Sequence, residues 1–404
     1  MNAINLKKIW TTILLFISAF PLWPKAVESV LMILFFILSI SLFFTQKKEK
    51  LKNKSIKNVF ILSSLFIIYV ISSIYSDNNS ESLRFLVLSS PILMFPLCFG
   101  FFCNNEISTK EISRIKIIYV SSLLLSLAIT HLYLWLNVDG IISSWDYRNL
   151  FENYTKVHGT YFSLWISFGI LILINELFAL KRSSFFLFLS LIILAYFFYW
   201  QFTIGARLPL FVTLVLCTFF LLKKTNKKYK LLFIITLTTI VVSIIYLKFD
   251  SIKNKIKVGI PEGKYELKHK EMTSEDIRAG IYYCSASLIK NSFLFGYGVG
   301  DVNDELNNCY KQKIKSDVYQ LLHYNSHNQY LQVLLSAGVL GFVFFIFAIL
   351  SIFKKAIINK DELFLMLNLL ILICFLTENI LSRHDGVIFY SYFTSLFYFK
   401  TIKN

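Results

Sequence analysis

Charged residues are scarce in this chain, and their scarcity excludes an ordinary soluble protein. Asp, Glu, Lys and Arg together make up 16% of the 404 residues, whereas 56% are hydrophobic. Apolar runs of about 20 residues, the length that spans a bilayer as a helix, recur from one end of the chain to the other. Because a helix satisfies its backbone hydrogen bonds internally, the sequence predicts an all-α polytopic membrane protein.

Other signals are also missing. No soluble segment carries a basic face with interleaved aromatic residues, so the net charge of +17 does not indicate nucleic-acid binding. The first apolar stretch lacks a small-residue cleavage site and a second stretch follows at once, so no cleavable signal is expected. No internal repeat occurs, which argues against the half-to-half symmetry that is common in transporters.

About twelve membrane spans are predicted. Nine lie in residues 1–249 and three in residues 327–404, on either side of a long polar segment at 250–326. The predicted spans are 9–22, 27–45, 58–76, 84–103, 114–137, 158–179, 183–202, 206–222, 231–249, 327–353, 363–380 and 387–402.

The basic residues orient these spans. One set of alternating short loops and ends carries 23 Lys and Arg residues, whereas the opposite short loops carry six: Lys25, Arg84, Arg148, Lys156, Arg207 and Arg383. Under the positive-inside rule the first set is cytoplasmic. Both termini are therefore expected in the cytoplasm, and the segment 250–326 on the outer side.

The long outer segment has a helical pattern of its own. Thr273 and Asp276 have capping spacing, and apolar residues recur at helical intervals over 277–289. A glycine-rich stretch at 295–300 follows this helix, so it predicts a turn rather than a dinucleotide-binding loop, which would follow a strand. A second amphipathic helix is predicted over 302–321.

The chain has six cysteines, and two of them, Cys284 and Cys309, lie in the outer segment. An oxidising compartment would let these two pair. Because sequence does not show whether two residues are close in space, their pairing stays open.

His327 is the first candidate for chemistry. It lies where the polar segment meets an apolar span, and a neutral imidazole can take a proton from a hydroxyl group. The alternative is an interfacial histidine bonded to backbone. His323 lies four residues earlier, but no third ligand has suitable spacing, so no metal site is expected.

Four arginines are expected on the same outer side: Arg148, Arg207, Arg278 and Arg383. Guanidinium groups suit diphosphate oxygens, although each arginine alone is equally an interfacial anchor. His158 and Tyr161 open a span on this side and are candidates for substrate binding or for helix packing. Sequence does not choose among eight carboxylates near this side: Asp139, Asp146, Glu152, Asp301, Asp304, Glu305, Glu378 and Asp385.

One combination of these features resembles a known family. His327 and Asn328, followed after nine residues by Gly338-x-x-Gly341, are similar to the signature of the O-antigen ligase and polymerase superfamily. The resemblance extends over residues 140–400 and includes the late Arg383-x-x-Gly386 segment. It implies a helical bundle of the glycosyltransferase-C type, in which Gly338 and Gly341 serve close helix packing.

The resemblance also implies a reaction. The donor would be a glycan on a polyprenyl (undecaprenyl) diphosphate, and transfer would need no metal or other cofactor. His327 would activate the acceptor hydroxyl, and Arg207 and Arg278 would hold the diphosphate. Asn328, His158, Tyr161, Arg148 and Arg383 are expected to help bind substrate.

Three functions are compatible with this reading, all in a bacterial inner membrane with the site facing the periplasm. The first is a ligase that moves a finished glycan onto lipid A–core. The second is a polymerase that joins lipid-linked repeat units. The third is a transporter of lipid-linked sugars, which is disfavoured because the charges gather at one face rather than at the midplane.

Overall fold

The computed structural model describes residues 3–45, 53–103, 106–138, 140, 143–178, 183–224, 274–314 and 317–400. Every regular element in these residues is a helix, as the sequence predicts. The predicted span at 231–249 lies outside the described residues, and so do residues 250–273.

Seven helical stretches are long and apolar enough to cross a membrane, and each coincides with a predicted span. The chain is therefore a multi-pass membrane protein. The seven are α2 (Lys25–Thr45), the Ile56–Ser73 part of α3 (Asn53–Ser73), the run of α4 (Asn79–Ser89), α5 (Pro91–Pro96) and η2 (Leu97–Phe102), then α6 (Thr109–Asn137), α8 (Gly159–Leu177), α9 (Ser184–Ile204) and α16 (Gln329–Ile358).

Four other predicted spans are helices that are shorter or, in α10, more charged than the seven. They are α1 (Ala3–Ser18), α10 (Arg207–Lys224), α17 (Glu362–Cys374) and α18 (His384–Phe399). At 1.5 Å per residue, the 13 residues of α17 extend about 20 Å, whereas a hydrocarbon core is about 30 Å thick. Among the described residues, seven helical stretches are thus candidate spans by length and composition, and the total of about twelve stays a prediction.

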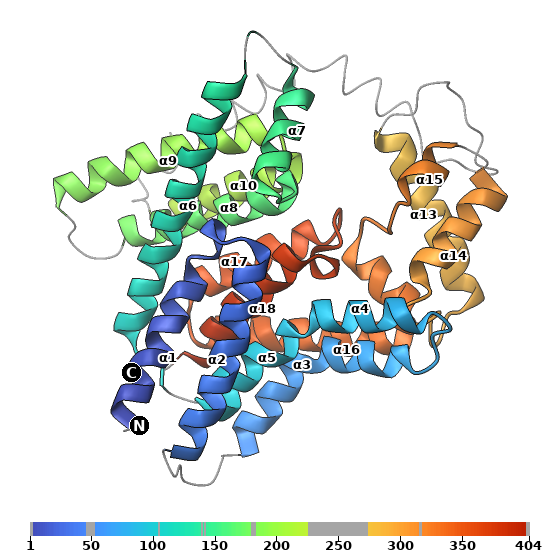
Figure 1. Ribbon diagram of the computed structural model, residues 1–404, viewed down its shortest axis with the longest axis horizontal. Helices are drawn as coiled ribbons and strands as arrows, with labels where there is room; N and C mark the ends of the chain where they lie inside the picture. Colours follow the sequence, from blue (N-terminus) through green and yellow to red (C-terminus); the bar gives the residue numbers. More distant parts are fainter. Residues whose placement is uncertain are drawn as a thin grey trace.

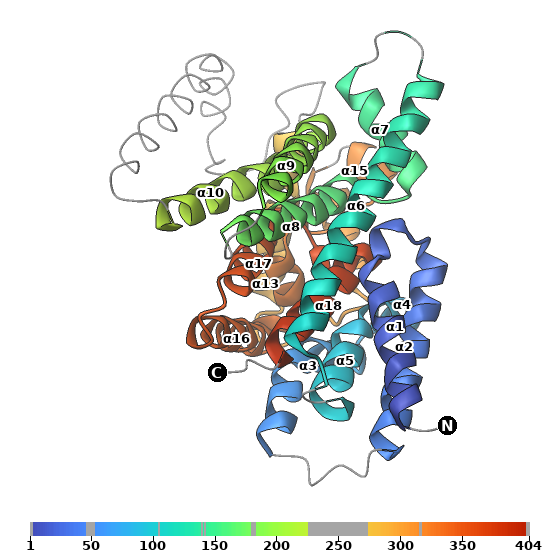
Figure 2. The same cartoon turned by 90° about the vertical axis from the view of Figure 1, so that its left-hand side faces the viewer.

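Helices α8 and α18 form the buried centre of the bundle (Figure 2). Both are apolar on every side, as expected of helices without a lipid-facing surface. The Phe168 ring of α8 packs edge-on against Phe389 and Phe393 of α18, with centroids 5.7 and 4.7 Å apart. This packing fixes the polar residues that precede the two helices, His158 and Arg383.

The described part of the outer segment forms a small unit beside α16 (Figure 1). It contains α13 (Ser274–Asn291), α14 (Val302–Cys309), the π-helix η3 (Tyr310–Ile314) and α15 (Asp317–Leu322). The second predicted amphipathic helix is therefore divided into shorter pieces. A disulfide between Cys284 and Cys309 joins α13 to α14, which answers the question that the sequence left open.

Helix α16 is broken at Gly338, whose φ of 61° and ψ of −168° suit glycine. The turn after α13 lies against this break. Tyr297 N–H donates to the Leu335 carbonyl at 2.8 Å, and the Val339 N–H donates to the carbonyl of Phe293 at 2.9 Å. Backbone groups that leave the helical ladder are therefore satisfied by the turn, as burial requires.

The two signature glycines thus make different contacts. A Cβ atom on Gly338 would lie 2.2 Å from the carbonyl oxygen of Leu294, so its close contact is with the turn and not with a neighbouring helix. A Cβ atom on Gly341 would lie 3.0 Å from Ile68, so Gly341 lies against α3. The packing role expected of Gly338 is replaced by a break that admits the turn.

Candidate functional site

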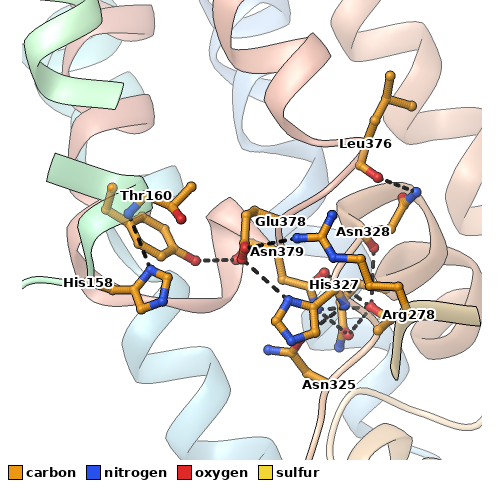
Figure 3. Close-up of polar contacts among 12 residues, drawn as sticks. His158, Thr160, Arg278, Asn325, His327, Asn328, Leu376, Glu378 and Asn379 are labelled. Carbon is orange, nitrogen blue, oxygen red and sulfur yellow. Dashed lines mark hydrogen bonds and ion pairs between the residues drawn. The ribbon is translucent and has the colours of Figure 1, made fainter. Parts of the chain in front are cut away.

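Glu378 lies between two of the predicted site residues. Its Oε2 atom is 3.6 Å from Nδ1 of His327, and its Oε1 atom is 3.9 Å from a terminal nitrogen of Arg278 (Figure 3). The Glu378 side chain is 12% exposed. The three residues come from the start of α16, the loop after α17 and the first turns of α13, so the fold brings distant parts of the chain to one point.

The loop that carries this carboxylate is hydrogen-bonded to the start of α16. Gln329 N–H donates to the Phe375 carbonyl at 2.8 Å, and the Asn328 amide donates to the Leu376 carbonyl at 3.0 Å. Leu381 N–H in turn donates to the Gln329 side chain at 2.8 Å. These bonds on both sides of the carboxylate hold it next to the imidazole.

A network of buried polar side chains also bonds to the loop that carries Glu378. The Asn379 amide donates to the Ser326 hydroxyl at 2.9 Å and to the Gln332 side chain at 3.0 Å. Tyr161 donates from its hydroxyl to the Asn379 carbonyl at 3.1 Å. All four residues are buried. Because buried polar groups are costly unless they are paired, this network favours a single position of the loop.

His327 has an unusual backbone. Its φ of 42° lies in the left-handed region, which costs a non-glycine residue about 1 kcal/mol or more. Its N–H donates to the Asn325 side chain at 3.0 Å, and the next residue, Asn328, caps α16 by accepting from Tyr330 and Leu331. With this backbone, Nδ1 of His327 lies toward Glu378.

The carboxyl group of Glu378 is held in its ionised form. Burial raises its pKa, but contact with His327, the charge of Arg278 and the charge that His158 carries once protonated at low pH outweigh burial and hold the pKa below the ordinary value of 4.5. At neutral pH Glu378 is therefore ionised, so it accepts hydrogen bonds and donates none. An ionised carboxylate beside an imidazole orients the ring and stabilises the imidazolium that forms when the ring takes a proton.

His158 is a second histidine near Glu378 (Figure 3). It caps α8 by accepting from the Thr160 N–H at 3.4 Å. Burial lowers its pKa despite the nearby carboxylates of Glu152 and Glu378, so the neutral ring is favoured. Arg148 donates from Nε to Glu152 at 2.8 Å within α7 (Ser144–Thr155), and its expected role in substrate binding stays a prediction.

The other predicted residues lie around this centre. The Arg383 guanidinium lies over the ring of Tyr161, 5.9 Å from its centroid, and Tyr161 itself is almost fully buried. Tyr161 and Asn328 each bond to the loop after α17, and their expected roles in substrate binding stay predictions. Arg207 begins α10, which packs on α8 and α17, and its place beside a diphosphate stays a prediction. No group of three His, Cys, Asp or Glu residues suited to a metal ion occurs among the described residues.

Sequence reasoning did not single out Glu378, Asn379 or Gln332. Glu378 was one of eight carboxylates without a distinguishing pattern. The signal for Gln332 was available, because it and Gln329 are polar residues one turn apart inside an apolar span. Polar groups inside a membrane segment usually face a partner or a site.

Comparison with known proteins bears on the middle of the chain. Residues 171–346 match the model of a family described as O-antigen ligase. The matched stretch contains Arg207, Arg278 and His327, whereas Glu378 and Arg383 lie beyond it. A comparison with curated proteins found no match.

Proposed function

We propose that the chain is a metal-independent glycosyltransferase of the O-antigen ligase and polymerase superfamily, which moves a glycan from a polyprenyl diphosphate to an acceptor hydroxyl; the match of residues 171–346 to a family described as O-antigen ligase supports this. The observation that carries this proposal is the arrangement of His327, Glu378 and Arg278. A base with an ionised partner lies beside a cation that suits a diphosphate.

The proposed reaction is a direct displacement. The acceptor oxygen forms a bond to the anomeric carbon while the bond from that carbon to the diphosphate oxygen breaks. Nε2 of His327 takes the acceptor proton, and Glu378 stabilises the resulting imidazolium. The diphosphate leaves with the electron pair, and Arg278 and Arg207 stabilise its growing charge.

We further propose a ligase that works on the periplasmic face of a bacterial inner membrane, with lipid A–core as acceptor and undecaprenyl diphosphate as glycan carrier. The distribution of basic residues supports this orientation. The disulfide between Cys284 and Cys309 also supports it, because disulfides persist in oxidising compartments such as the periplasm. Polymerisation of lipid-linked repeat units is the alternative outcome.

The test uses purified full-length protein in lipid nanodiscs with a lipid-linked glycan donor. His327→Ala is expected to lower transfer by at least about a hundredfold, the lower range for loss of a general base. His323→Ala is the matched control, because it removes an exposed histidine four residues away. Normal transfer by His327→Ala would refute the role of His327 as the base.

Two acceptors decide between ligase and polymerase. Transfer to lipid A–core, without extension of a lipid-linked repeat unit, identifies a ligase. Extension of the lipid-linked repeat unit alone identifies a polymerase. No transfer to either acceptor, with movement of the lipid-linked donor between leaflets, would instead indicate a transporter.

A further inference from the structure

A cavity of about 230 Å³ lies next to the start of α16, and the proposed reaction does not use it. Arg84 and Phe85 of α4 line it on one side. Arg383, which precedes α18, lines it as well, together with Asn325, the residue that accepts the His327 N–H. The cavity therefore lies close to the proposed base, and residues from distant parts of the chain line it.

The lining of this cavity is rich in hydrogen-bond donors. Besides the two guanidinium groups, it contains one hydroxyl group and four side-chain amides, and no carboxylate belongs to it. These further polar residues are Ser382, Asn303, Asn325, Gln332 and Asn379. Such a lining differs from that of an ordinary ligand pocket, which is mostly apolar with a few polar groups. It is suited to an anionic, hydroxyl-rich ligand.

Several of these donors have no partner among the described residues. The buried hydroxyl of Ser382 makes no hydrogen bond. Gln332 uses its amide oxygen to accept from Ser326 and Asn379, while its amide nitrogen makes no bond in the described chain. Since buried polar groups are normally satisfied, the unpaired hydroxyl of Ser382 indicates that a ligand completes the site, and the amide nitrogen of Gln332 is available to the same ligand.

The two arginines supply positive charge without a carboxylate in the lining. No ion pair of Arg383 occurs within the described part of the chain, and its guanidinium lies over the ring of Tyr161. Glu81 holds Nε and one terminal nitrogen of Arg84, at 2.8 and 2.7 Å, which leaves the other terminal nitrogen for the cavity. Two guanidinium groups around one cavity are suited to an anion with several oxygen atoms.

We propose that this cavity binds one anionic sugar unit of a substrate glycan. Arg84 and Arg383 bind its phosphate or carboxylate group, the amides bind its hydroxyls, and Phe85 contacts its apolar face. The volume suits a single sugar, because pockets for larger ligands begin at about 300 Å³. The assignment of the sugar to a glycan substrate rests on the proposed function, whereas its chemistry rests on the cavity alone.

Binding tests the chemistry first. Glucose 6-phosphate and glucose are compared as probes by saturation-transfer NMR with the full-length protein in nanodiscs. The wild-type protein is expected to prefer the phosphorylated sugar. Arg84→Gln and Arg383→Gln should each weaken that binding by about tenfold to a hundredfold, the range for charge-assisted hydrogen bonds. The matched control is Arg114→Gln, an exposed arginine in α6.

Two outcomes would overturn the proposal. One is equal binding of the two sugars by the wild-type protein, and the other is unchanged binding by both glutamine variants. Arg383→Lys provides a readout if Arg383→Gln does not fold, because it keeps the charge and should retain most of the preference.

Transfer assays then identify the source of the sugar. Anionic groups are removed enzymatically from the acceptor in one arm and from the donor glycan in the other. Removal of the anionic group from the bound substrate should raise the KM of the wild type. It should not change the KM of Arg383→Gln, which is already raised. The arm that gives this pair of results identifies the bound substrate. His327→Ala should still bind glucose 6-phosphate, so loss of the proposed reaction and loss of this site give different results. An equal response of wild type and Arg383→Gln in both arms would refute the glycan assignment.

Discussion

Glu378→Gln removes one charge from the centre of the site and preserves the shape of the side chain. In the wild type, its carboxylate lies 3.6 Å from Nδ1 of His327 and 3.9 Å from Arg278. The amide cannot offset the positive charge that His327 gains during transfer. The neighbouring arginine then repels the imidazolium without compensation. We expect a lower kcat with a much smaller change in KM, since the lost interaction strengthens in the transition state.

The size of the effect follows from the distance. At 3.6 Å and an effective dielectric constant of about 20, two unit charges attract by about 4 to 5 kcal/mol, which is an upper limit here. His327 is 26% exposed, and Arg278 shares the carboxylate, so water and the second cation reduce the attraction. We expect about 2 to 3 kcal/mol, which lowers kcat by about thirtyfold to 150-fold.

The assay measures initial rates of glycan transfer in nanodiscs over a range of donor concentrations. Glu305→Gln serves as the control, because it removes a carboxylate from α14 that contacts neither His327 nor Arg278 in the described structure. A kcat within twofold of wild type for Glu378→Gln would refute the role of Glu378. A rise in KM at constant kcat would instead assign it to substrate binding.

Three further predictions concern stability. The pKa of Glu378 is below 4.5 in the folded protein, so its contribution is complete above that pH and is lost as pH falls through the lower folded value. The melting temperatures of wild type and Glu378→Gln should thus converge as the pH falls below 4.5 and through the lower folded pKa, and a constant gap would contradict this. Replacing Cys284 and Cys309 with serine opens a loop of 25 residues and should cost about 3 kcal/mol in denaturant unfolding; a loss below about 1 kcal/mol would contradict it. Gly338→Ala should lower the free energy of unfolding by about 3 kcal/mol, because a Cβ atom is strained at its positive φ and would clash with the backbone of Leu294. Gly140→Ala is the control, because Gly140 also has a positive φ but has open space around it, so it should show the strain without the clash.

The position of His327 was predictable from sequence, because two signals coincide there. The hydropathy pattern places it at the end of the long polar segment, and the spacing to Gly338 and Gly341 is a local property of the chain. Local patterns also indicated the helices, since the period of apolar residues and the length of each run are set within one segment.

The partner of His327 was not predictable in the same way. In the sequence, α16 and α17 lie between His327 and Glu378. The carboxylate is held near the imidazole because Gln329 and Asn328 form hydrogen bonds with the loop after α17. That loop begins where α17 ends at Cys374, well before the predicted end of the span at residue 380. Contacts made by tertiary packing leave no periodic trace in a single sequence.

The break in α16 also escaped prediction, because the apolar run continues through Gly338 without interruption. Its cause is the turn after α13, whose backbone bonds replace those of the helix. Glycine allows the break but does not reveal it, since glycines are also common in unbroken membrane helices.

The broken helix has a consequence for how the protein is assembled. The backbone groups of residues 335–339 bond to the turn at 293–297, and without that turn they would have to bond within the helix, because unpaired groups cost several kcal/mol each in lipid. The turn precedes α16 in the chain, so during synthesis it is already made when α16 enters the membrane. The shape of α16 is therefore coupled to docking of the outer segment, and a chain that lacks this segment is expected to carry its proposed base on an unbroken helix.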